Sequence, residues 1–488
     1  MQDRPFLIRG AAVLSMDPAI GDLPAGDILV QGDRIAAIGH CLDAPEGAEI
    51  LDAAEMIAVP GFVDTHRHVW QTQLRSVATD WSLCDYTINM RSVFASFYQP
   101  EDVWLGNHIG ALEALNAGIT SVVDHCHIVN SPEHADAAVQ GHRDAGIGGV
   151  FCYGMFRNAR HHPGAPIDVA ELIGEMWGDV EDWRFADAER LRGNGFGAHD
   201  RLRFGLATNE FELKPYDEVQ AELRRVIAME PQRISMHAGM GALAKDNRMV
   251  KHFLADGLLD ERALFVHGGG FTDEELRILA DHGCAISATP DTEMQMAMGH
   301  PVAYRFADAG GRASLGIDIV SNIGGDMFSQ MRLMLQAHRA WLNAWAEQDG
   351  RTPGTVTVQA RSILEMATIG GARAIGMDDC LGSLSPGKFA DIALIDTRAI
   401  NMTPMIDPVG AVIFYANPSN VDTVLAGGRI VKRGGQLTGI DWPALRRRLI
   451  ASSDRVLSKA QRIPLEKIQA LWTAPWYFDR RAAIEAVS

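Results

Sequence analysis

Short apolar runs alternate with longer helix-like stretches through the middle of the chain, from about residue 57 to residue 378. Runs of roughly four to eight apolar, β-branched residues predict buried strands, and longer stretches that open on capping residues predict helices. The expected strands are 57–64, 119–124, 147–153, 202–207, 233–238, 263–267, 284–288 and 313–318. The expected helices include 101–117, 134–145, 217–229, 272–282 and 325–345. Eight strand-then-helix units predict an α/β fold, a (β/α)8 barrel.

Two β-rich segments flank this region. Residues 1–56 have the pattern of short strands separated by turns, and residues 379–440 repeat it, for example in "VDTVLAGGRIVKRGG". Neither segment is large enough to hold a core alone. We therefore expect both to fold together into one small β-sandwich beside a barrel domain of residues 57–378. Residues 441–488 are expected to form a helical C-terminal tail.

The charge balance excludes some classes of partner. The 488 residues include 62 acidic and 44 basic side chains, which gives a formal net charge of −18. Nucleic acids and anionic membranes bind basic surfaces, so neither is an expected partner. The six cysteines include no C-x-x-C pair, the N-terminus lacks signal-peptide features, and no apolar segment approaches the ~18 residues of a membrane span. We expect a cytoplasmic protein that acts on a small molecule.

Histidine or an acidic residue follows most of the predicted strands. In a β/α barrel the C-terminal ends of all strands meet on one face, where functional side chains gather. A lone histidine at a strand end is more often a hydrogen-bonded core residue than a ligand. Here at least five of the eight runs end in histidine or aspartate, which indicates one shared site. The residues concerned are His66, His68, Asp124, His125, His127, His237, His267 and Asp318.

His66 and His68 have the spacing of two ligands of one ion. Side chains at i and i+2 of a strand point to the same side, so both imidazoles can reach one cation while Arg67 faces away. Neutral imidazole suits zinc, iron and similar metals. With His237 and Asp318 the set becomes three histidines and one aspartate, which leaves a coordination position for water, as a catalytic site requires.

Other polar residues near the strand ends are candidates for the substrate pocket. His125 and His127 form a second H-x-H pair, for which a pocket role or a supporting role behind the ligands is favoured over ligation. Trp70, with Trp81 and several methionines near the strand ends, suggests an apolar or aromatic substrate, although core filling explains the methionines equally well. Glu210 and Glu293 follow the fourth and seventh expected strands and are candidate proton carriers.

The chain resembles the amidohydrolase superfamily, in particular its cytosine-deaminase and triazine-hydrolase-like branch. The resemblance covers nearly the whole sequence and rests on "PGFVDTHRH", "GITSVVD", "ISMHAG", "LFVHGGG", "SLGIDIVSN" and "GSLSPGKFADIALID". It implies that His66, His68, His237 and Asp318 bind one divalent metal ion. Zinc is the first choice, with iron or manganese as alternatives. The resemblance also implies that His267 contacts the attacking water or the developing oxyanion, and it suggests a homodimer or larger homo-oligomer.

Two departures from the family pattern affect the predicted chemistry. Heterocycle deaminases of this branch carry His-x-x-Glu on the fifth strand, whereas this chain has "HAGM", so Met240 stands where the proton-shuttling glutamate would be. A thioether cannot transfer a proton. The loop after the seventh strand usually bears an asparagine, and here Glu293 stands near that position and could replace the missing acid. Glu210 is the other candidate.

These residues predict a metal-dependent hydrolase of a non-peptide carbon–nitrogen bond, such as that of an amide or carbamate. A bound metal ion lowers the pKa of water towards ~7, and Asp318 is then the expected general base while His267 stabilises the developing negative charge. The alternative is an aminohydrolase of a purine, pyrimidine or triazine-like ring, which the loss of the usual glutamate disfavours. A non-catalytic structural relative is the third possibility, and retention of the whole ligand set argues against it.

Overall fold

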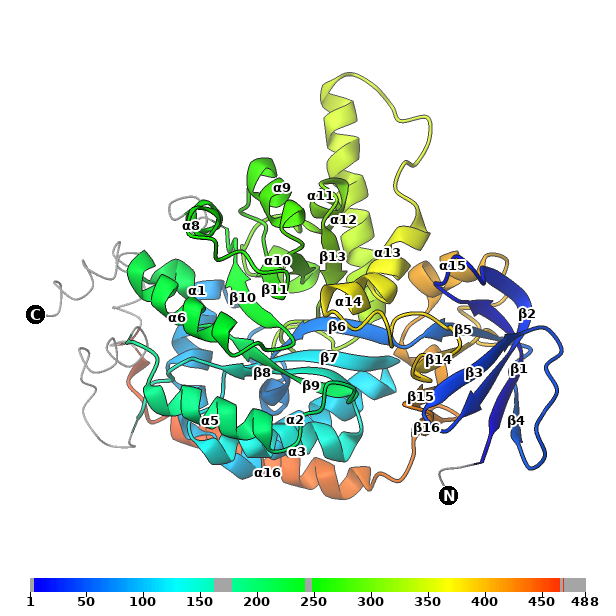
Figure 1. Ribbon diagram of the computed structural model, residues 1–488, viewed down its shortest axis with the longest axis horizontal. Coiled ribbons are helices and arrows are strands. Elements are labelled where there is room, and N and C mark those ends of the chain that lie inside the picture. The colour runs from blue at the N-terminus through cyan, green and yellow to red at the C-terminus, as the bar shows by residue number, and fades with distance from the viewer. Residues whose placement is uncertain (1–3, 162–177, 242–247, 466–467, 469–488) are drawn as a thin grey trace, which may run out of the picture.

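The computed structural model describes residues 4–161, 178–241, 248–465 and 468. Their strands form two sheets, one of eight strands and one of nine. The eight-stranded sheet lies at the centre of Figure 1 among the helices, and the nine-stranded sheet lies at one end of the molecule. The expected α/β class is confirmed, with a barrel and a smaller β-structure built from both ends of the chain.

The central sheet is a nearly closed parallel barrel. Its strand order follows the sequence, and neighbouring strands pair in parallel. The strands are β6 (Phe62–Arg67), β7 (Ile119–Cys126), β8 (Gly148–Gly154), β9 (Leu202–Ala207), β10 (Ile234–Ala238), β11 (Ala263–His267), β12 (Ala285–Ala288) and β13 (Arg312–Leu315). Arg67 and Asp318 form a parallel bridge across the remaining gap, so the first and last strands meet at their C-terminal ends.

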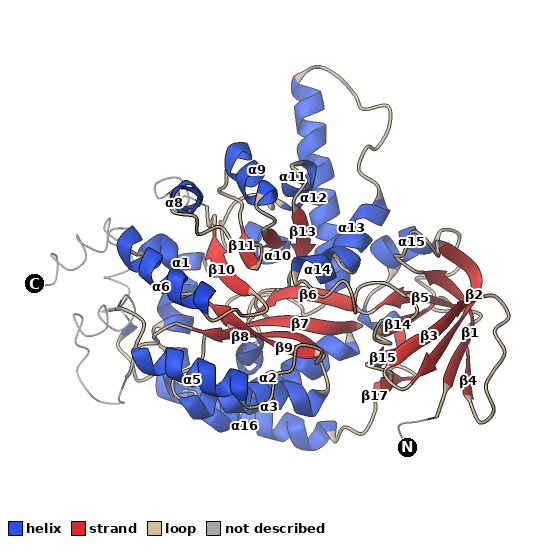
Figure 2. Cartoon of the chain, in the orientation of Figure 1, coloured by secondary structure: helices blue, strands red, loops and turns tan. Residues whose placement is uncertain are grey.

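Helices connect these strands and cover the barrel, as Figure 2 shows. The helices expected from the sequence are confirmed, and each end lies within three residues of its expected position. The capping residues and the periodic apolar positions of each helix indicate the same bounds. They are α2 (Pro100–Asn116), α3 (Pro132–Ala145), α6 (Tyr216–Ala228), α9 (Asp273–Asp281) and α12 (Met327–Gln348). Thr272 caps α9 in a capping box with Glu275. Further helices are α5 (Asp182–Gly193), α8 (Met249–Ala255), α10 (Pro290–Gln295), α11 (Ala303–Asp308), α13 (Ala360–Met366) and α14 (Ile369–Ala374).

The segment between β6 and α2 is a series of short helical turns. It contains η1 (Val69–Leu74), α1 (Leu83–Tyr86), η2 (Thr87–Arg91) and η3 (Phe94–Phe97). Tyr86 and Arg91 are buried in it although the stretch has little regular structure. The side chains of this segment reach the C-terminal ends of the strands, because Tyr86 Oη lies 3.3 Å from Nε2 of His127, which directly follows β7.

The first expected strand, 57–64, is divided between the two sheets. Residues Met56–Pro60 form β5 of the small sheet, and Phe62–Arg67 form β6 of the barrel, with Gly61 between them. A β-carbon on Gly61 would lie 2.2 Å from Oγ1 of Thr120, so the chain can pass only without a side chain there. The apolar run is continuous because residues on both sides of Gly61 are buried, each in a different sheet.

The small sheet combines strands from both ends of the chain. Its strands are β1 (Phe6–Leu14), β2 (Asp22–Gln31), β3 (Arg34–Gly39), β4 (Glu49–Asp52), β5, β14 (Ile392–Asp396), β15 (Val421–Ala426), β16 (Arg429–Arg433) and β17 (Gln436–Leu437). They form one mixed hydrogen-bonded sheet, in which β5 pairs with β1 on one side and with β14 on the other. The expected domain bounds at residues 57, 378 and 440 stay a prediction, because strand pairing does not measure independent folding.

The C-terminal segment begins with α16 (Trp442–Ala460), which contacts α2 and η1 of the barrel. The rest of the expected tail over 441–488 lies mostly outside the described residues. None of the described helices combines the length and the apolar composition that crossing a bilayer demands.

Candidate metal-binding active site

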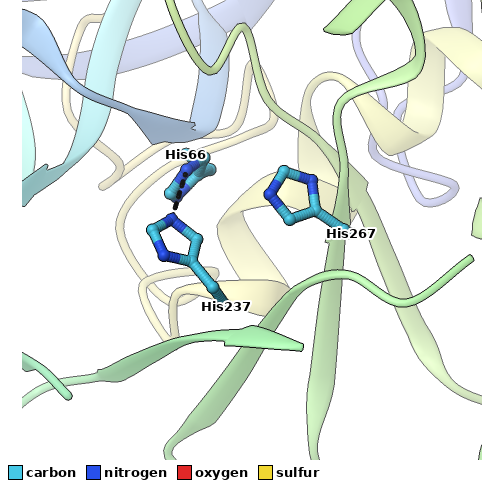
Figure 3. Close-up of side chains that lie close together, drawn as sticks. All are labelled: His66, His237 and His267. Atoms are coloured by element: carbon cyan, nitrogen blue, oxygen red, sulfur yellow. Dashed lines mark hydrogen bonds between the residues drawn. The ribbon is translucent and has the colours of Figure 1, made fainter. Parts of the chain in front are cut away.

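Side chains from both halves of the barrel converge at the C-terminal ends of the strands. Nε2 of His66 lies 3.3 Å from Oδ1 of Asp318, and Nε2 of His68 lies 3.4 Å from the same oxygen. Nε2 of His237 lies 3.4 Å from Nε2 of His66. Figure 3 shows this contact between a nitrogen of His66 and one of His237, with the ring of His267 beside them.

These residues fit a divalent cation. The ligand atoms of His66, His68 and Asp318 lie within 4.8 Å of one another, as do those of His66, His237 and His267. Burial first, and then the neighbouring imidazoles, hold the pKa of His66 well below its usual value, and burial does the same for the pKa of His68. The rings are therefore neutral and present lone pairs. Several neutral imidazoles and one carboxylate around one point form a donor set that suits zinc.

Two of the candidate ligands are oriented by hydrogen bonds on their second nitrogen. Nδ1 of His68 donates to the backbone oxygen of His125 at 2.8 Å. Nδ1 of His237 donates to the carboxylate of Glu210, at 3.1 and 3.2 Å from its two oxygens. Each bond leaves Nε2 without a proton and directs it to the centre of the cluster. Burial raises the pKa of Glu210, but His237 and Arg91 outweigh burial and make the net shift downward, so the carboxylate is ionised.

His267 is linked to Glu293 behind it. Its Nδ1 lies 3.0 Å from Oγ1 of Thr289 and 3.4 Å from Oε1 of Glu293, which also accepts a hydrogen bond from the backbone nitrogen of Thr289. Burial lowers the pKa of His267, but Glu293 and the charge of Asp318 more than offset burial and raise the pKa overall. Glu293 therefore lies against the ring of His267, on the side remote from the cluster of Nε2 atoms.

Asp318 lies in the loop after β13. The sequence predicted it at the end of a strand over 313–318, but β13 already ends at Leu315. Its backbone is held on both sides: its nitrogen donates to the oxygen of His66 at 2.9 Å, and its oxygen accepts from the nitrogen of His68 at 2.8 Å. Asp318 and His267 both have a positive φ, of 70° and 80°, which is uncommon for residues other than glycine. Strained backbone of this kind is concentrated at functional sites.

Asp64 positions this loop, a role that the sequence did not reveal. Its Oδ1 accepts hydrogen bonds from the backbone nitrogen of Ile317 at 3.0 Å and from that of His66 at 3.3 Å. One carboxylate thus holds the residue before Asp318 and one of the candidate ligands together. A carboxylate in the middle of a buried strand was the only sequence signal for it.

His125, His127 and Trp70 lie beside the candidate ligands. The ring of His127 stacks on His68 at 4.0 Å between centroids, and the ring of His125 stacks on His237 at 4.1 Å. Trp70 is fully buried and its Nε1 donates to Nδ1 of His127 at 3.0 Å. These contacts place His125 and His127 against the rings of candidate ligands, with Trp70 against His127. A direct contact with substrate stays a prediction for all three.

Met240 is buried in the loop after β10, where the sequence pattern of the resembled branch has glutamate. A different carboxylate supports that loop: Glu212 accepts hydrogen bonds from the backbone nitrogens of Gly239 at 2.8 Å and Met240 at 3.3 Å. Burial raises the pKa of Glu212 to about 7. Sequence reasoning missed Glu212, because its contact depends on how two loops fold together.

Comparisons with known proteins agree with this architecture. A model of the amidohydrolase family matches residues 57–431. A 5-methylthioadenosine/S-adenosylhomocysteine deaminase of Pelotomaculum thermopropionicum is 28% identical over 89% of this chain and 95% of its own length. A 5'-deoxyadenosine deaminase of Methanothermobacter thermautotrophicus is 26% identical over 90% of this chain and 95% of its own length.

Solved structures share the fold at lower identity. A zinc-bound adenosine deaminase from Xanthomonas campestris superimposes with a TM-score of 0.78 at 22% identity, covering 93% of this chain and 98% of that one. An atrazine chlorohydrolase from Arthrobacter aurescens TC1, complexed with zinc, superimposes with a TM-score of 0.78 at 23% identity, covering 92% of this chain and 100% of that one.

Proposed function

Because the chain belongs to the amidohydrolase family and is a hydrolase of carbon–nitrogen bonds other than peptide bonds, we propose that it removes an exocyclic amino group from a small nitrogen heterocycle. The curated relatives named above are deaminases of adenine nucleosides, and they match along nearly their whole length. The observation that carries the proposal is the convergence of Asp318 and two imidazole nitrogens at 3.3 and 3.4 Å, next to His267.

The candidate ligands are His66, His68, His237 and Asp318, which would hold one divalent metal ion, with zinc as the first choice. When bound, such an ion lowers the pKa of water and so supplies a nucleophile at neutral pH. Oδ1 of Asp318 is the proposed base that takes a proton from the attacking water, because it lies at the centre of the cluster within 3.4 Å of two imidazoles.

His267 is the proposed proton donor on the opposite side of the reacting carbon. The contact with Glu293 favours its protonated form, and the protonated ring can stabilise negative charge and give a proton to the ring nitrogen or to the leaving amino group. In this proposal Glu293 replaces the missing fifth-strand acid indirectly, through His267. Glu210 is the less favoured proton carrier in this proposal, because its carboxylate accepts from Nδ1 of His237 and so serves to orient a candidate ligand.

Hydrolysis of an acyclic amide or carbamate is the second candidate, and Met240 is the observation that favours it. A ring deaminase must protonate its heterocycle as aromaticity is lost, whereas acyl transfer can proceed with Asp318 and His267 alone. The thioether of Met240 is buried and offers no proton.

One substrate panel tests the family-level activity and separates the two candidates. Zinc-loaded protein is assayed for ammonia release from adenosine, 5'-methylthioadenosine, S-adenosylhomocysteine and melamine, and for aniline release from acetanilide and methyl N-phenylcarbamate. We expect turnover of at least one heterocycle, and loss of that turnover in Asp318→Asn. Turnover of the acyclic compounds alone would favour the second candidate, and activity retained by Asp318→Asn would overturn the assignment of the base.

We further propose a cytoplasmic homo-oligomer, a homodimer or larger. Burial of Cys126, Cys152 and Cys284 as thiols supports a reducing compartment. Light scattering coupled to gel filtration measures the assembly directly, and a monomeric mass at micromolar concentration would contradict it.

A further inference from the structure

A buried arginine lies beside the site without a full set of partners. Arg91 ends η2, and its side chain is 7% exposed. Its Nε donates to Oδ1 of Asn158 at 3.2 Å, and this is its only side-chain hydrogen bond within the part of the chain that the structure describes. Neither of its two terminal nitrogens is a fully buried atom that lacks a hydrogen-bond partner. The guanidinium therefore has free donors and some access to solvent.

The guanidinium is held rigidly in this position. It lies over the ring of Phe156, with Cζ 4.3 Å from the ring centroid. The amide nitrogen of Asn158 donates to the backbone oxygen of His127 and to Oδ1 of Asn130, both at 2.8 Å, so only its oxygen is available to Arg91. A stacked guanidinium with one fixed hydrogen bond presents its outer edge in a defined direction.

Arg91 is next to the proposed catalytic cluster. Phe156, on which it stacks, has ring centroids of His125, His127 and His237 at 5.6, 5.7 and 6.4 Å. Nη1 of Arg91 forms an ion pair with Oε1 of Glu210 at 3.7 Å, a distance too long for a hydrogen bond. Both oxygens of Glu210 lie closer to Nδ1 of His237, and among the described residues Arg91 makes no hydrogen bond to this carboxylate.

We propose that Arg91 binds a carboxylate of the substrate, so that the enzyme acts on small aromatic or heteroaromatic compounds that carry this group. Guanidinium pairs with carboxylate through two parallel hydrogen bonds, and the free outer edge of Arg91 offers that geometry. The ring of Phe156 lies against both the guanidinium of Arg91 and the ring of His127, so the guanidinium has aromatic neighbours. The inference rests on the proposed function, because it assigns one end of the substrate of the same site.

The alternative role for Arg91 is to position Glu210 and, through it, His237. The two roles predict opposite effects of removing the charge of Glu210. If Arg91 binds a substrate carboxylate, Glu210→Gln removes a competing anion and strengthens carboxylate binding. If Arg91 only supports Glu210, Glu210→Gln and Arg91→Met should have the same effect on carboxylate binding.

Binding of benzoate and benzamide to the zinc-loaded enzyme tests the inference without requiring turnover. Titration calorimetry at pH 7.5 is applied to wild type, Arg91→Met, Arg91→Lys and Glu210→Gln, and the zinc content of each sample is measured. The matched control is Arg351→Met, because Arg351 is 71% exposed and pairs only with the nearby Asp349 among the described residues.

We expect the wild type and the control to prefer benzoate over benzamide by roughly 10- to 100-fold, the range of a charge-assisted pair. Arg91→Met should abolish this preference, Arg91→Lys should retain part of it, and Glu210→Gln should tighten benzoate binding. An unchanged preference in zinc-loaded Arg91→Met, or a parallel loss in Glu210→Gln, would overturn the inference. Because no reaction is measured, failure of the proposed function would appear only in the substrate panel.

Discussion

At the level of single residues, the site consists of candidate ligands and the groups that orient them. His68 is oriented by a backbone oxygen on β7, and His237 by the carboxylate of Glu210 after β9. Neighbouring strands thus contribute either a ligand or the acceptor that fixes a ligand's tautomer. Such supporting hydrogen bonds commonly change metal affinity by about 10- to 100-fold.

Replacement of Glu210 by alanine should therefore weaken zinc binding by about 10- to 100-fold, because Nδ1 of His237 loses its acceptor. Glu210→Gln keeps an amide oxygen and should fall between alanine and wild type. Competition with a chromophoric chelator measures the affinity, and Glu274→Ala, an exposed glutamate on α9, is the control. Wild-type affinity in Glu210→Ala would contradict the orienting role.

Glu293→Gln should lower kcat by about 100-fold, because general acid catalysis contributes at least that much. The amide oxygen can still accept from the backbone nitrogen of Thr289, so the local fold should persist. Glu293 raises the pKa of His267, so its removal lowers that pKa. Activity that depends on protonated His267 should then be lost at lower pH in the variant than in wild type. An unshifted pH–rate profile would exclude His267 as the acid.

At the level of secondary structure elements, the sequence predicted the type and position of each helix or strand better than the points at which one strand ends and the next begins. The helices and most strands were predicted because apolar periodicity and capping residues reflect local packing. The break at Gly61 was missed, because the apolar run continues from one sheet into the other without a polar residue. The position of Asp318 beyond β13 was missed because contacts with β6, distant in the sequence, hold it there.

Gly61→Ala should destabilise the protein by about 1–3 kcal/mol, because the new methyl group would overlap the side chain of Thr120. The added Thr120→Ala substitution should recover part of this loss, since it removes both contacting atoms nearest to the methyl group. Urea unfolding of the two single variants and the double variant measures the coupling. Gly193→Ala is the control, because a methyl group added there would meet no described atom within 4 Å. Equal effects of the two glycine substitutions would refute the steric explanation.

At the level of the whole molecule, buried polar contacts join the small sheet to the barrel. Lys432 on β16 is 2% exposed, and its Nζ donates to the backbone oxygen of Asn116, the last residue of α2, at 2.6 Å. Asp391 accepts from Arg201 at 2.9 Å across the same boundary. The barrel and the small sheet therefore share an interface with charged groups at its centre.

Lys432 makes stability depend on pH in a predictable direction. Burial lowers its pKa to about 8 from 10.5. Between these values the unfolded chain binds the proton and the folded protein does not, so the contribution of this group to stability rises with pH by at most about 3 kcal/mol. The difference in unfolding free energy between wild type and Lys432→Met should therefore increase from pH 8 to pH 10.5, by up to about 3 kcal/mol. A difference that is constant across this range would contradict the assignment.

The sequence predicted the candidate ligands more completely than the rest of the site. His66, His68, His237 and Asp318 could be selected because a barrel brings the ends of all strands to one face. Asp64, Glu212 and Arg91 could not, because their contacts depend on loop conformations that no local pattern encodes. Glu293 was recognised as a candidate acid, but its position behind His267 required the structure.

The most direct test of the account is the zinc content of the purified protein and of His237→Ala, measured by plasma mass spectrometry after gel filtration. We predict about one zinc ion per wild-type chain and a large loss in the variant, because the proposed site holds one cation with four candidate ligands, of which His237 is one. A wild-type chain that binds no divalent metal, or a variant that keeps its full metal content, would contradict it.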